Sequence, residues 1–311
     1  MEIYEINHIN HDISLQQYLK KLITSEVCKI GFELCGFAKV TEWDEIQNLK
    51  QWVVDNLCAD MMWFAKTLPV RKDIRKWFPE VKSIIAVGEN YYHNCDNSYV
   101  ALYAHGIDYH IRMRNKLKNI AEFVKKIVKG GKCRISVDSS PVHEKYWAKK
   151  AGLGWQGKNT LIINPVYGSW FNIGILAVNF VLPEDVQLDN HCGECSKCVD
   201  VCPTNALLYP GVLDANKCIS YHTVENRKLI PDEISNRNKR YIFGCDFCQI
   251  VCPWNRKTPV TPRPDACDEK VYEGIKQILN SGDIPTFSVF NLTSMKRLGL
   301  KLLKRNASLL T

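Results

Sequence analysis

Seven cysteines in two short runs constrain the folding of this 311-residue chain more than any other feature. The first run, HCGECSKCVDVCP, spaces four cysteines as C-x2-C-x2-C-x3-C and places a proline directly after the last. The second, CDFCQIVCP, has three cysteines and also ends in proline, and Ile242 stands where a fourth cysteine would begin it. Cysteines this densely spaced indicate a segment that folds around a bound metal centre.

The spacing is typical of the bacterial ferredoxin pattern, in which three cysteines of a run bind one [4Fe-4S] cluster and the fourth binds the other. Cys218, between the runs, brings the number of ligands to eight. The predicted sets are Cys192, Cys195, Cys198 and Cys252 for one cluster, and Cys202, Cys218, Cys245 and Cys248 for the other. Zinc is the alternative metal, but a zinc site needs neither the interleaved spacing nor the paired prolines.

The other cysteines show no ligand spacing, and we expect them to be buried as small apolar side chains. They are Cys28, Cys35, Cys58, Cys95, Cys133 and Cys267. The N-terminal segment is polar and has no apolar signal core. Together with the clustered cysteines, this predicts a reducing, cytoplasmic location rather than a secreted, disulfide-bonded protein.

Strands and helices alternate up to about residue 185, which indicates an α/β (α+β) core. The expected elements are a helix over 14–30, a buried strand from Ser83, a helix over 111–131, a strand from Cys133, and a helix over 143–152. Ser140 and Pro141 are expected to cap and begin the last helix. Residues 159–183 carry no charge and are long enough to span a membrane. Their Asn, Gly and Pro content instead favours two buried strands joined by a hairpin.

This organisation predicts a core over 1–185, a two-cluster module over 186–262, and a linker with a basic tail over 263–311. The formal net charge is +8, and its excess lies in residues 217–257 and 284–311. A localised basic surface is typical of nucleic-acid binding, although a solvated basic face explains the charge equally well.

The segment VDSSPVHEKYWAKKAGLGWQGKNT, from Val137, carries the second chemical pattern. Residues Gly152 to Asn159 are similar to a phosphate-binding P-loop, but Asn159 stands where that loop needs a Ser or Thr hydroxyl. A P-loop also follows a strand and precedes a helix, whereas here a helix is expected before it and a strand after it. Asp138 ends a strand and faces the next helix, a common position for an active-site carboxylate. Such a carboxyl group donates a proton at neutral pH when its pKa is raised. A helix cap is the commoner role for an aspartate at this position.

Taken together, these patterns resemble the epoxyqueuosine reductase family. Four stretches carry the resemblance: ADMMWF from Ala59, YAHGIDYH from Tyr103, the segment from Val137, and the cysteine runs with SYHTVEN between them. That family is similar to reductive dehalogenases in having a cobalamin-binding α/β core followed by a ferredoxin-like module with two [4Fe-4S] clusters.

The resemblance implies reduction of epoxyqueuosine to queuosine at the wobble position of tRNA. An external low-potential donor of ferredoxin or flavodoxin type would send electrons through both clusters to base-off cobalamin. Cob(I)alamin would then attack the epoxide while Asp138 donates a proton. The implied cobalamin contacts are Met61, Ala101, Tyr103, Asp138, Lys158, Ile162, Ser169 and Ser220. The basic residues expected to contact tRNA phosphates are Arg227, Lys239 and Arg240.

The chain departs from the family pattern at His105 and Lys145, where arginine is usual. We expect both side chains to be polar and to keep a positive charge, fully or in part. It also lacks the C-terminal helical repeats of longer members. Two alternative functions are a corrinoid-dependent reductase of a small molecule and a ferredoxin-type electron carrier. The first is usually exported with a twin-arginine signal that this N-terminus lacks, and the second leaves the α/β core and Asp138 unexplained.

Overall fold

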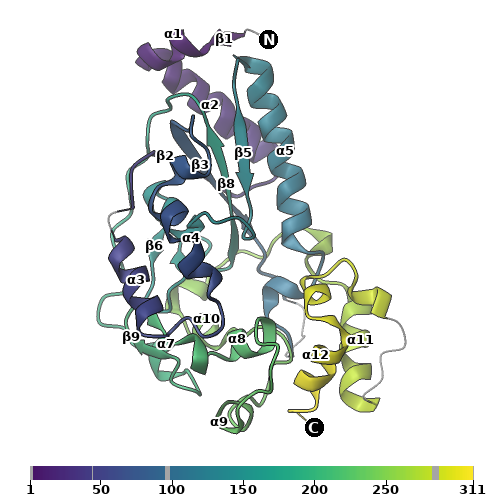
Figure 1. Cartoon of the computed structure of the whole chain (residues 1–311). Coiled ribbons are helices and arrows are strands. Elements are labelled where there is room, and N and C mark those ends of the chain that lie inside the picture. Colours follow the sequence, from purple (N-terminus) through teal and green to yellow (C-terminus); the bar gives the residue numbers. More distant parts are fainter. Residues whose placement is uncertain (1–2, 44, 95–98, 282–286, 311) are drawn as a thin grey trace.

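Four antiparallel strands form the central sheet of the chain (Figure 1). The computed structural model describes residues 3–43, 45–94, 99–281 and 287–310. The order of the strands across the sheet is β2 (Leu34–Lys39), β3 (Ser83–Asn90), β8 (Phe171–Val178) and β5 (Cys133–Ser136). Every neighbouring pair in this sheet is antiparallel. One short parallel pair lies outside it, between β1 (Tyr4–Glu5) and β4 (Val128–Lys129).

The two middle strands are apolar on both faces because helices cover both faces of the sheet. Ile85 and Leu176 belong to a hydrophobic cluster with α2 (Ile13–Lys29) and α5 (Tyr109–Ile127). Ile84 and Ile175 belong to a second cluster, on the side of α6 (Glu144–Lys150). All eight residues of β3 are buried, which explains its nearly continuous apolar sequence.

Helix α5 follows directly from its sequence pattern. Its buried residues include Met113, Leu117, Ile120 and Val124, which recur at helical spacing and form one apolar face. The Asp108 side chain caps the first turn by accepting a hydrogen bond from the His110 backbone N–H at 3.0 Å. The predicted helices over 14–30 and 111–131 are confirmed as α2 and α5, except that α5 ends at Ile127 and a short strand follows it. The predicted strands from Ser83 and Cys133 are confirmed as β3 and β5.

The predicted hairpin in residues 159–183 is only partly correct. A turn does form, because the Asn164 side chain accepts hydrogen bonds from the backbone N–H groups of Val166 and Tyr167. However, the strand before the turn, β7 (Ile162–Ile163), pairs with β6 (Trp155–Gln156). The strand after it, β8, lies between β3 and β5. Because β8 is buried on both faces, it is more stable at the centre of the sheet than in an isolated hairpin. No helix among the described residues is long and apolar enough to cross a membrane.

The predicted cap of α6 is wrong. The helix begins at Glu144 rather than after Pro141, and its capping residue, His143, makes no side-chain cap. The physical reason lies in the preceding turn, where Asp138 has a left-handed backbone with φ of +56°. This conformation turns the backbone N–H of Asp138 toward the Glu144 carboxylate, which accepts its hydrogen bond at 2.7 Å.

The cysteine-rich part consists of short helices and one small hairpin. Its elements are α7 (Lys197–Asp200), β9 (Leu207–Tyr209), β10 (Val212–Leu213), η3 (Ala215–Lys217), α8 (Ile219–Val224), α9 (Asp232–Ser235), α10 (Phe247–Ile250) and η4 (Pro253–Asn255). The remaining elements of the N-terminal part are β1 (Tyr4–Glu5), α1 (Ile6–His11), α3 (Ile46–Val54), α4 (Trp63–Lys72), η1 (Ile74–Lys76), η2 (Leu102–Ala104) and β4 (Val128–Lys129).

The C-terminal segment is folded onto the rest of the chain. It contains η5 (Pro264–Ala266), α11 (Glu269–Ser281), η6 (Phe287–Phe290), η7 (Ser294–Arg297) and α12 (Gly299–Ala307). Ile275 and Leu303 of this segment share a hydrophobic cluster with Val100 and Phe243. The two longer helices lie side by side near the C-terminus (Figure 1). The predicted basic tail is therefore helical and packed against the rest of the fold.

Outside the two runs, the cysteines do not share the buried environment that we expected. Cys58 is buried, whereas Cys28 is exposed and contradicts the expectation. Cys35 and Cys133 are half-buried, and Cys267 forms a disulfide. Cys95 lies outside the described residues.

Candidate active site

The first predicted ligand set surrounds one cavity. Cys192, Cys195, Cys198 and Cys252 line a space of about 260 Å³ beside Trp254. Burial raises the pKa of Cys198, and the neighbouring Cys252 and Cys192 raise it further. The pKa of Cys252 is likewise raised by burial and by Cys192 and Cys195. Thiols that raise one another's pKa become stable thiolates when a cationic metal centre binds between them. The donor set therefore fits one [4Fe-4S] cluster.

The second predicted set lines a larger cavity of about 390 Å³. Cys202, Cys218, Cys245 and Cys248 all contribute to its wall. Burial raises the pKa of Cys248 well above its usual value, and Cys218 adds to this. Cys218, which completed the count of ligands in the sequence, thus lies with the other three. The structure brings both predicted sets together, and ligation itself stays a prediction.

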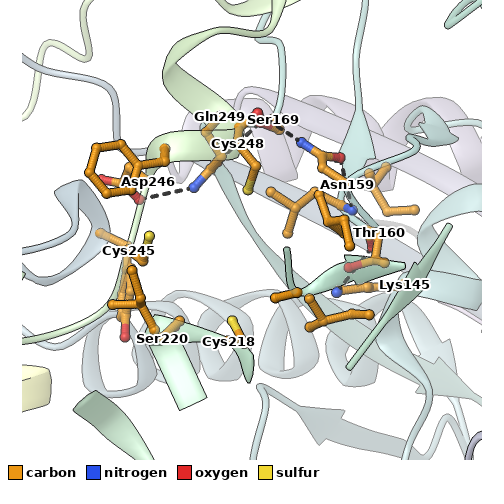
Figure 2. Close-up of a pocket in the computed structure, with 18 of the residues that line it drawn as sticks. Lys145, Asn159, Thr160, Ser169, Cys218, Ser220, Cys245, Asp246, Cys248 and Gln249 are labelled. Atoms are coloured by element: carbon orange, nitrogen blue, oxygen red, sulfur yellow. Dashed lines mark hydrogen bonds between the residues drawn. The ribbon is translucent and has the colours of Figure 1, made fainter. Parts of the chain in front are cut away.

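Asn159 connects the two cavities, since it lines both of them. Its side-chain nitrogen donates a hydrogen bond to the Cys248 carbonyl oxygen at 3.4 Å. Figure 2 shows the larger cavity, with Cys245 and Asp246 across from Lys145 and Thr160. The Lys145 ammonium donates to the Thr160 carbonyl oxygen at 3.1 Å. The two cavities therefore lie next to each other and share one wall residue, an arrangement that would suit electron transfer between two clusters.

Asp138 lies at the end of β5 and lines the same larger cavity as the second cysteine set. Its side chain is 53% exposed. The Glu144 carboxylate fixes the end of β5 through two hydrogen bonds. It accepts one from the Asp138 backbone N–H at 2.7 Å and one from the Ser136 hydroxyl at 2.6 Å. Burial raises the pKa of Glu144 to about 7. Glu144 therefore maintains the left-handed turn that directs Asp138 toward the cavity.

His110 links Asp138 to a second carboxylate. Its Nε2 lies 3.1 Å from Asp138 Oδ2, and its Nδ1 lies 2.7 Å from Asp108 Oδ1. Burial alone would lower the pKa of His110, but the hydrogen bonds to Asp108 and Asp138 outweigh it and raise that pKa to about 9. Burial alone would raise the pKa of Asp138, but the hydrogen bond and charge of His110 keep it below its usual value. At neutral pH the pair is an imidazolium beside a carboxylate.

The predicted cobalamin contacts fall into two groups. Tyr103, Asp138, Ile162, Ser169 and Ser220 line the larger cavity. The others, which do not line it, are Met61, Ala101 and Lys158. Ala101 is 1% exposed and donates its backbone N–H to the Phe243 carbonyl oxygen at 2.8 Å. Lys158 borders the smaller cavity, where its ammonium donates to the Gly193 carbonyl oxygen.

The wall of the larger cavity has unused hydrogen-bonding capacity for a cofactor with amide side chains. Asn172 lines it, and the side-chain nitrogen of Asn172 is buried without a hydrogen-bond partner among the described residues. A buried amide donor is stable only when something accepts its hydrogen bond. The surrounding wall is mostly apolar, with Leu161, Phe171 and Ile173 beside Asn172. Sequence reasoning missed Asn172, although it interrupts the apolar run of β8.

Two further residues of the site were missed, Tyr109 in the cavity wall and His110 beside Asp138, and one expectation was wrong. Tyr109 and His110 belong to the YAHGIDYH stretch, so the resemblance pointed to this region without assigning them roles. Lys145 lines the cavity, and burial lowers the pKa of its ammonium group. His105, in contrast, is 1% exposed, and burial lowers its pKa to about 4. It is a neutral, buried imidazole and does not replace the family's arginine as a cation.

The predicted tRNA contacts lie on the surface of the cluster module. Arg227 and Lys239 are exposed, whereas Arg240 is half-buried and lies over the Tyr241 ring at 5.5 Å. Arg297 of η7 forms an ion pair with Glu225 at 2.8 Å. The positive charge of Arg297 also helps to lower the pKa of Asp138. The C-terminal segment therefore brings a cation close to the active site.

Comparisons with known families and proteins agree over most of the chain. Residues 71–139 match the family described as "Epoxyqueuosine reductase QueG, DUF1730", and residues 191–255 match "4Fe-4S double cluster binding domain". The epoxyqueuosine reductase of Synechocystis sp. is 38% identical over 287 residues, covering 88% of this chain and 98% of its own. That of Prochlorococcus marinus (strain NATL2A) is 40% identical over 276 residues, covering 85% and 88%.

Comparisons with solved structures point to the same family. A crystal structure of epoxyqueuosine reductase with an epoxyqueuosine-modified tRNA stem loop is similar at a TM-score of 0.84 and 27% identity, over 94% of this chain and 80% of that one. The epoxyqueuosine reductase of Streptococcus thermophilus is similar at 0.84 and 28%, over 94% and 81%. A catabolic reductive dehalogenase shares the fold at a TM-score of 0.51 and 17% identity, over 98% of this chain and 40% of that one.

Proposed function

This chain belongs to the epoxyqueuosine reductase family, and from that membership we propose that it reduces epoxyqueuosine to queuosine in tRNA with Asp138 as the proton donor. One observation carries the proposal beyond the family assignment. A single cavity is lined both by Asp138 and by the second cysteine set. A reductive step needs electrons and protons at the same place, and this cavity has a source of each.

Cobalamin is the cofactor that we assign to the larger cavity. When bound, it supplies a strongly reducing, nucleophilic cobalt centre. Ser169 and Ser220 would hold its edges, and Asn172 would donate a hydrogen bond to one of its amide groups. The Ser169 hydroxyl is itself oriented by donating to Gln249 Oε1 at 3.0 Å. The apolar wall would keep water away from the reacting groups.

Conversion of an epoxide to an alkene with loss of water consumes two electrons and two protons. Asp138 lines the cavity and would give the first proton to the opening oxygen. A cofactor and substrate that fill the cavity displace water from the half-exposed carboxyl group, and this desolvation raises its pKa. His110, which is protonated at neutral pH, would return a proton to Asp138 before the second transfer. Asp108 holds the imidazole in place for that step.

The substrate is a tRNA anticodon loop, and the modified base must leave its stack to reach Asp138. Arg227, Lys239 and Arg240 are the proposed phosphate contacts on the cluster module. Arg297 adds a cation from the C-terminal segment at a position where its charge reaches Asp138.

The electrons come from a donor outside this chain, and we propose a low-potential ferredoxin or flavodoxin. They would enter at the cluster in the smaller cavity and leave from the one in the larger cavity, because only the latter shares its cavity with Asp138. A tRNA substrate and oxygen-sensitive clusters both favour the cytoplasm.

The proposal is tested with anaerobically purified holoprotein, dithionite and epoxyqueuosine-containing tRNA, followed by mass spectrometry of the nucleosides. We expect queuosine, and a fall of at least about 100-fold in Asp138→Asn with iron and corrinoid contents unchanged. Asp55→Asn, which changes an exposed carboxylate at the end of α3, is the matched control and keeps full activity. Absence of corrinoid binding would instead support an electron carrier.

A further inference from the structure

Two histidines and a cysteine outside the active site lie close enough together to bind a metal ion. The ligand atoms of His93, His105 and Cys267 all lie within 4.8 Å of one another. His93 follows β3, His105 follows η2, and Cys267 stands between η5 and α11. The two imidazole rings have centroids 4.8 Å apart. Three chain segments thus converge on one point.

The tautomer of His105 is set by its surroundings. Its Nε2 lies 2.8 Å from the Val100 carbonyl oxygen. Because a carbonyl oxygen only accepts, Nε2 carries the hydrogen and Nδ1 carries the lone pair. Among the described residues, Nδ1 is buried and has no hydrogen-bond partner. A ring that donates one N–H to a backbone carbonyl and presents its other nitrogen to a buried space is typical of a metal ligand.

Burial distinguishes this cluster from an accidental group of polar side chains on a surface. His105 is 1% exposed and His93 is 7% exposed. Around tetrahedral zinc, nitrogen and sulfur ligands lie about 3.5 Å apart, so modest side-chain rotations would close the site. We propose that His93, His105 and the thiolate of Cys267 bind one Zn²⁺ ion, with a fourth ligand completing the tetrahedron.

The proposal concerns the thiol form of Cys267, whose sulfur takes part in a disulfide in this structure. A cellular dithiol reduces that disulfide to two thiols and becomes a disulfide itself, so electrons and protons balance. Zinc binding then releases the thiol proton of Cys267 to solvent. Two imidazoles and one thiolate form a borderline-soft set that suits zinc better than magnesium or calcium. The Cys267 sulfur can therefore form either the disulfide or the bond to zinc, but not both at once.

The site would attach the C-terminal segment to the wall of the active site. The backbone N–H of Asp268 donates to the His105 carbonyl oxygen at 3.3 Å, and that of Ile107 donates to Asp265 at 3.4 Å. Element η2, directly before His105, carries Tyr103, which lines the larger cavity. Zinc would therefore stabilise η2 and the segment that brings Arg297 toward Asp138. This inference rests on the three ligands and is independent of the proposed function.

The test measures zinc in the presence of the clusters. Holoprotein is reduced with a phosphine, given one equivalent of zinc and freed of excess, and its zinc and iron are counted by mass spectrometry. We expect one zinc beside eight irons, and a zinc absorption edge fitted by one sulfur with the remaining ligands nitrogen or oxygen. Cys267→Ser and His105→Gln should lose the zinc and keep the iron. The matched controls, Cys133→Ser and His11→Gln, should keep both.

Two results would overturn the proposal: no zinc in the wild type beyond that in Cys267→Ser, or zinc with an all-sulfur shell, which means occupation of a cysteine run. If the variants fold poorly, the proposal is tested on the wild type alone, by the rate at which Cys267 is alkylated. Zinc should slow alkylation of Cys267 by iodoacetamide roughly tenfold or more, because coordination removes the free thiolate, while exposed Cys28 reacts unchanged. Equal rates at Cys267 with and without zinc would also contradict the site.

Discussion

His110 Nε2 lies 3.1 Å from Asp138 Oδ2, which joins a protonated imidazole to the carboxylate that lines the active-site cavity. The two residues are 28 positions apart in the sequence. They meet because α5 begins beside the end of β5. This contact resolves an apparent conflict, since Asp138 has a lowered pKa but is proposed to act as an acid. The acidic proton is held by the pair, and desolvation by ligands transfers it toward Asp138.

The first prediction concerns the pH dependence of turnover. Because the pKa of His110 is raised to about 9, the rate should fall as pH rises through about 9. In His110→Gln this fall should disappear, and the rate at pH 7 should drop roughly 10- to 100-fold. Single-turnover rates between pH 6 and 10 provide the measurement, with His11→Gln as the control. An unchanged profile would exclude His110 from proton supply.

The same ion pair also contributes to stability. The pKa of His110 in the folded protein lies above its ordinary value of 6.5. The contribution is therefore fully present below about pH 6.5 and is lost as pH rises through about 9. His110→Gln should lose stability more at pH 6 than at pH 10.

The second prediction separates a positioning role of Glu144 from a chemical one. Glu144→Ala removes the acceptor for Asp138 N–H and Ser136 Oγ, so the left-handed turn relaxes. We expect kcat to fall about tenfold or more with little change in KM. Glu144→Gln keeps an acceptor oxygen and should restore most of the rate. If glutamine is as impaired as alanine, the carboxylate itself takes part in the chemistry.

The third prediction concerns Cys218, which the sequence predicts as the eighth cluster ligand. Cys218→Ala removes one of the four thiols of the larger cavity. Iron should fall from about eight to about four per chain, with the cluster of the smaller cavity retained. Iron analysis and electron paramagnetic resonance of the reduced protein measure this. Cys28→Ala, at an exposed cysteine, is the control. A variant that retains eight irons would show that another residue supplies the ligand.

The fourth prediction concerns tRNA binding. Arg227→Ala and Lys239→Ala each remove an exposed cation from the cluster module. Each should weaken binding of an anticodon stem loop and reduce the slope of log K against log salt by about 0.7 to 0.9. Lys125→Ala, at an exposed lysine on α5, should leave the slope unchanged. Identical slopes for all three variants would show that tRNA binds to a different surface of the protein.

The elements best predicted from sequence are those in which local pattern and tertiary environment agree. In α5, the apolar spacing and the cap at Asp108 already define the helix. The hairpin prediction failed because turn residues such as Asn164 determine where the chain bends but not which strand pairs with which. The cap at Ser140 failed because the turn at Asp138, which is held by the Glu144 carboxylate, delays the start of the helix to Glu144.

His105 illustrates the same limit at a single residue. Its sequence context predicts a cation, because the resemblance places an arginine at this position. Burial makes that imidazole neutral, and it faces His93 and Cys267 instead of the active site. Charge state depends on solvation, and solvation depends on packing that no local pattern records.

The sequence by itself determined the family and predicted eight cluster ligands, Cys218 among them, because motifs and ligand spacing are properties of the chain. Only the tertiary structure decided that Asp138 meets His110, that the second cysteine set shares its cavity with Asp138, and that His93, His105 and Cys267 converge. These are contacts between distant segments. They depend on strand order and on the packing of helices against the sheet, which arise only when the chain buries its apolar surface as a whole.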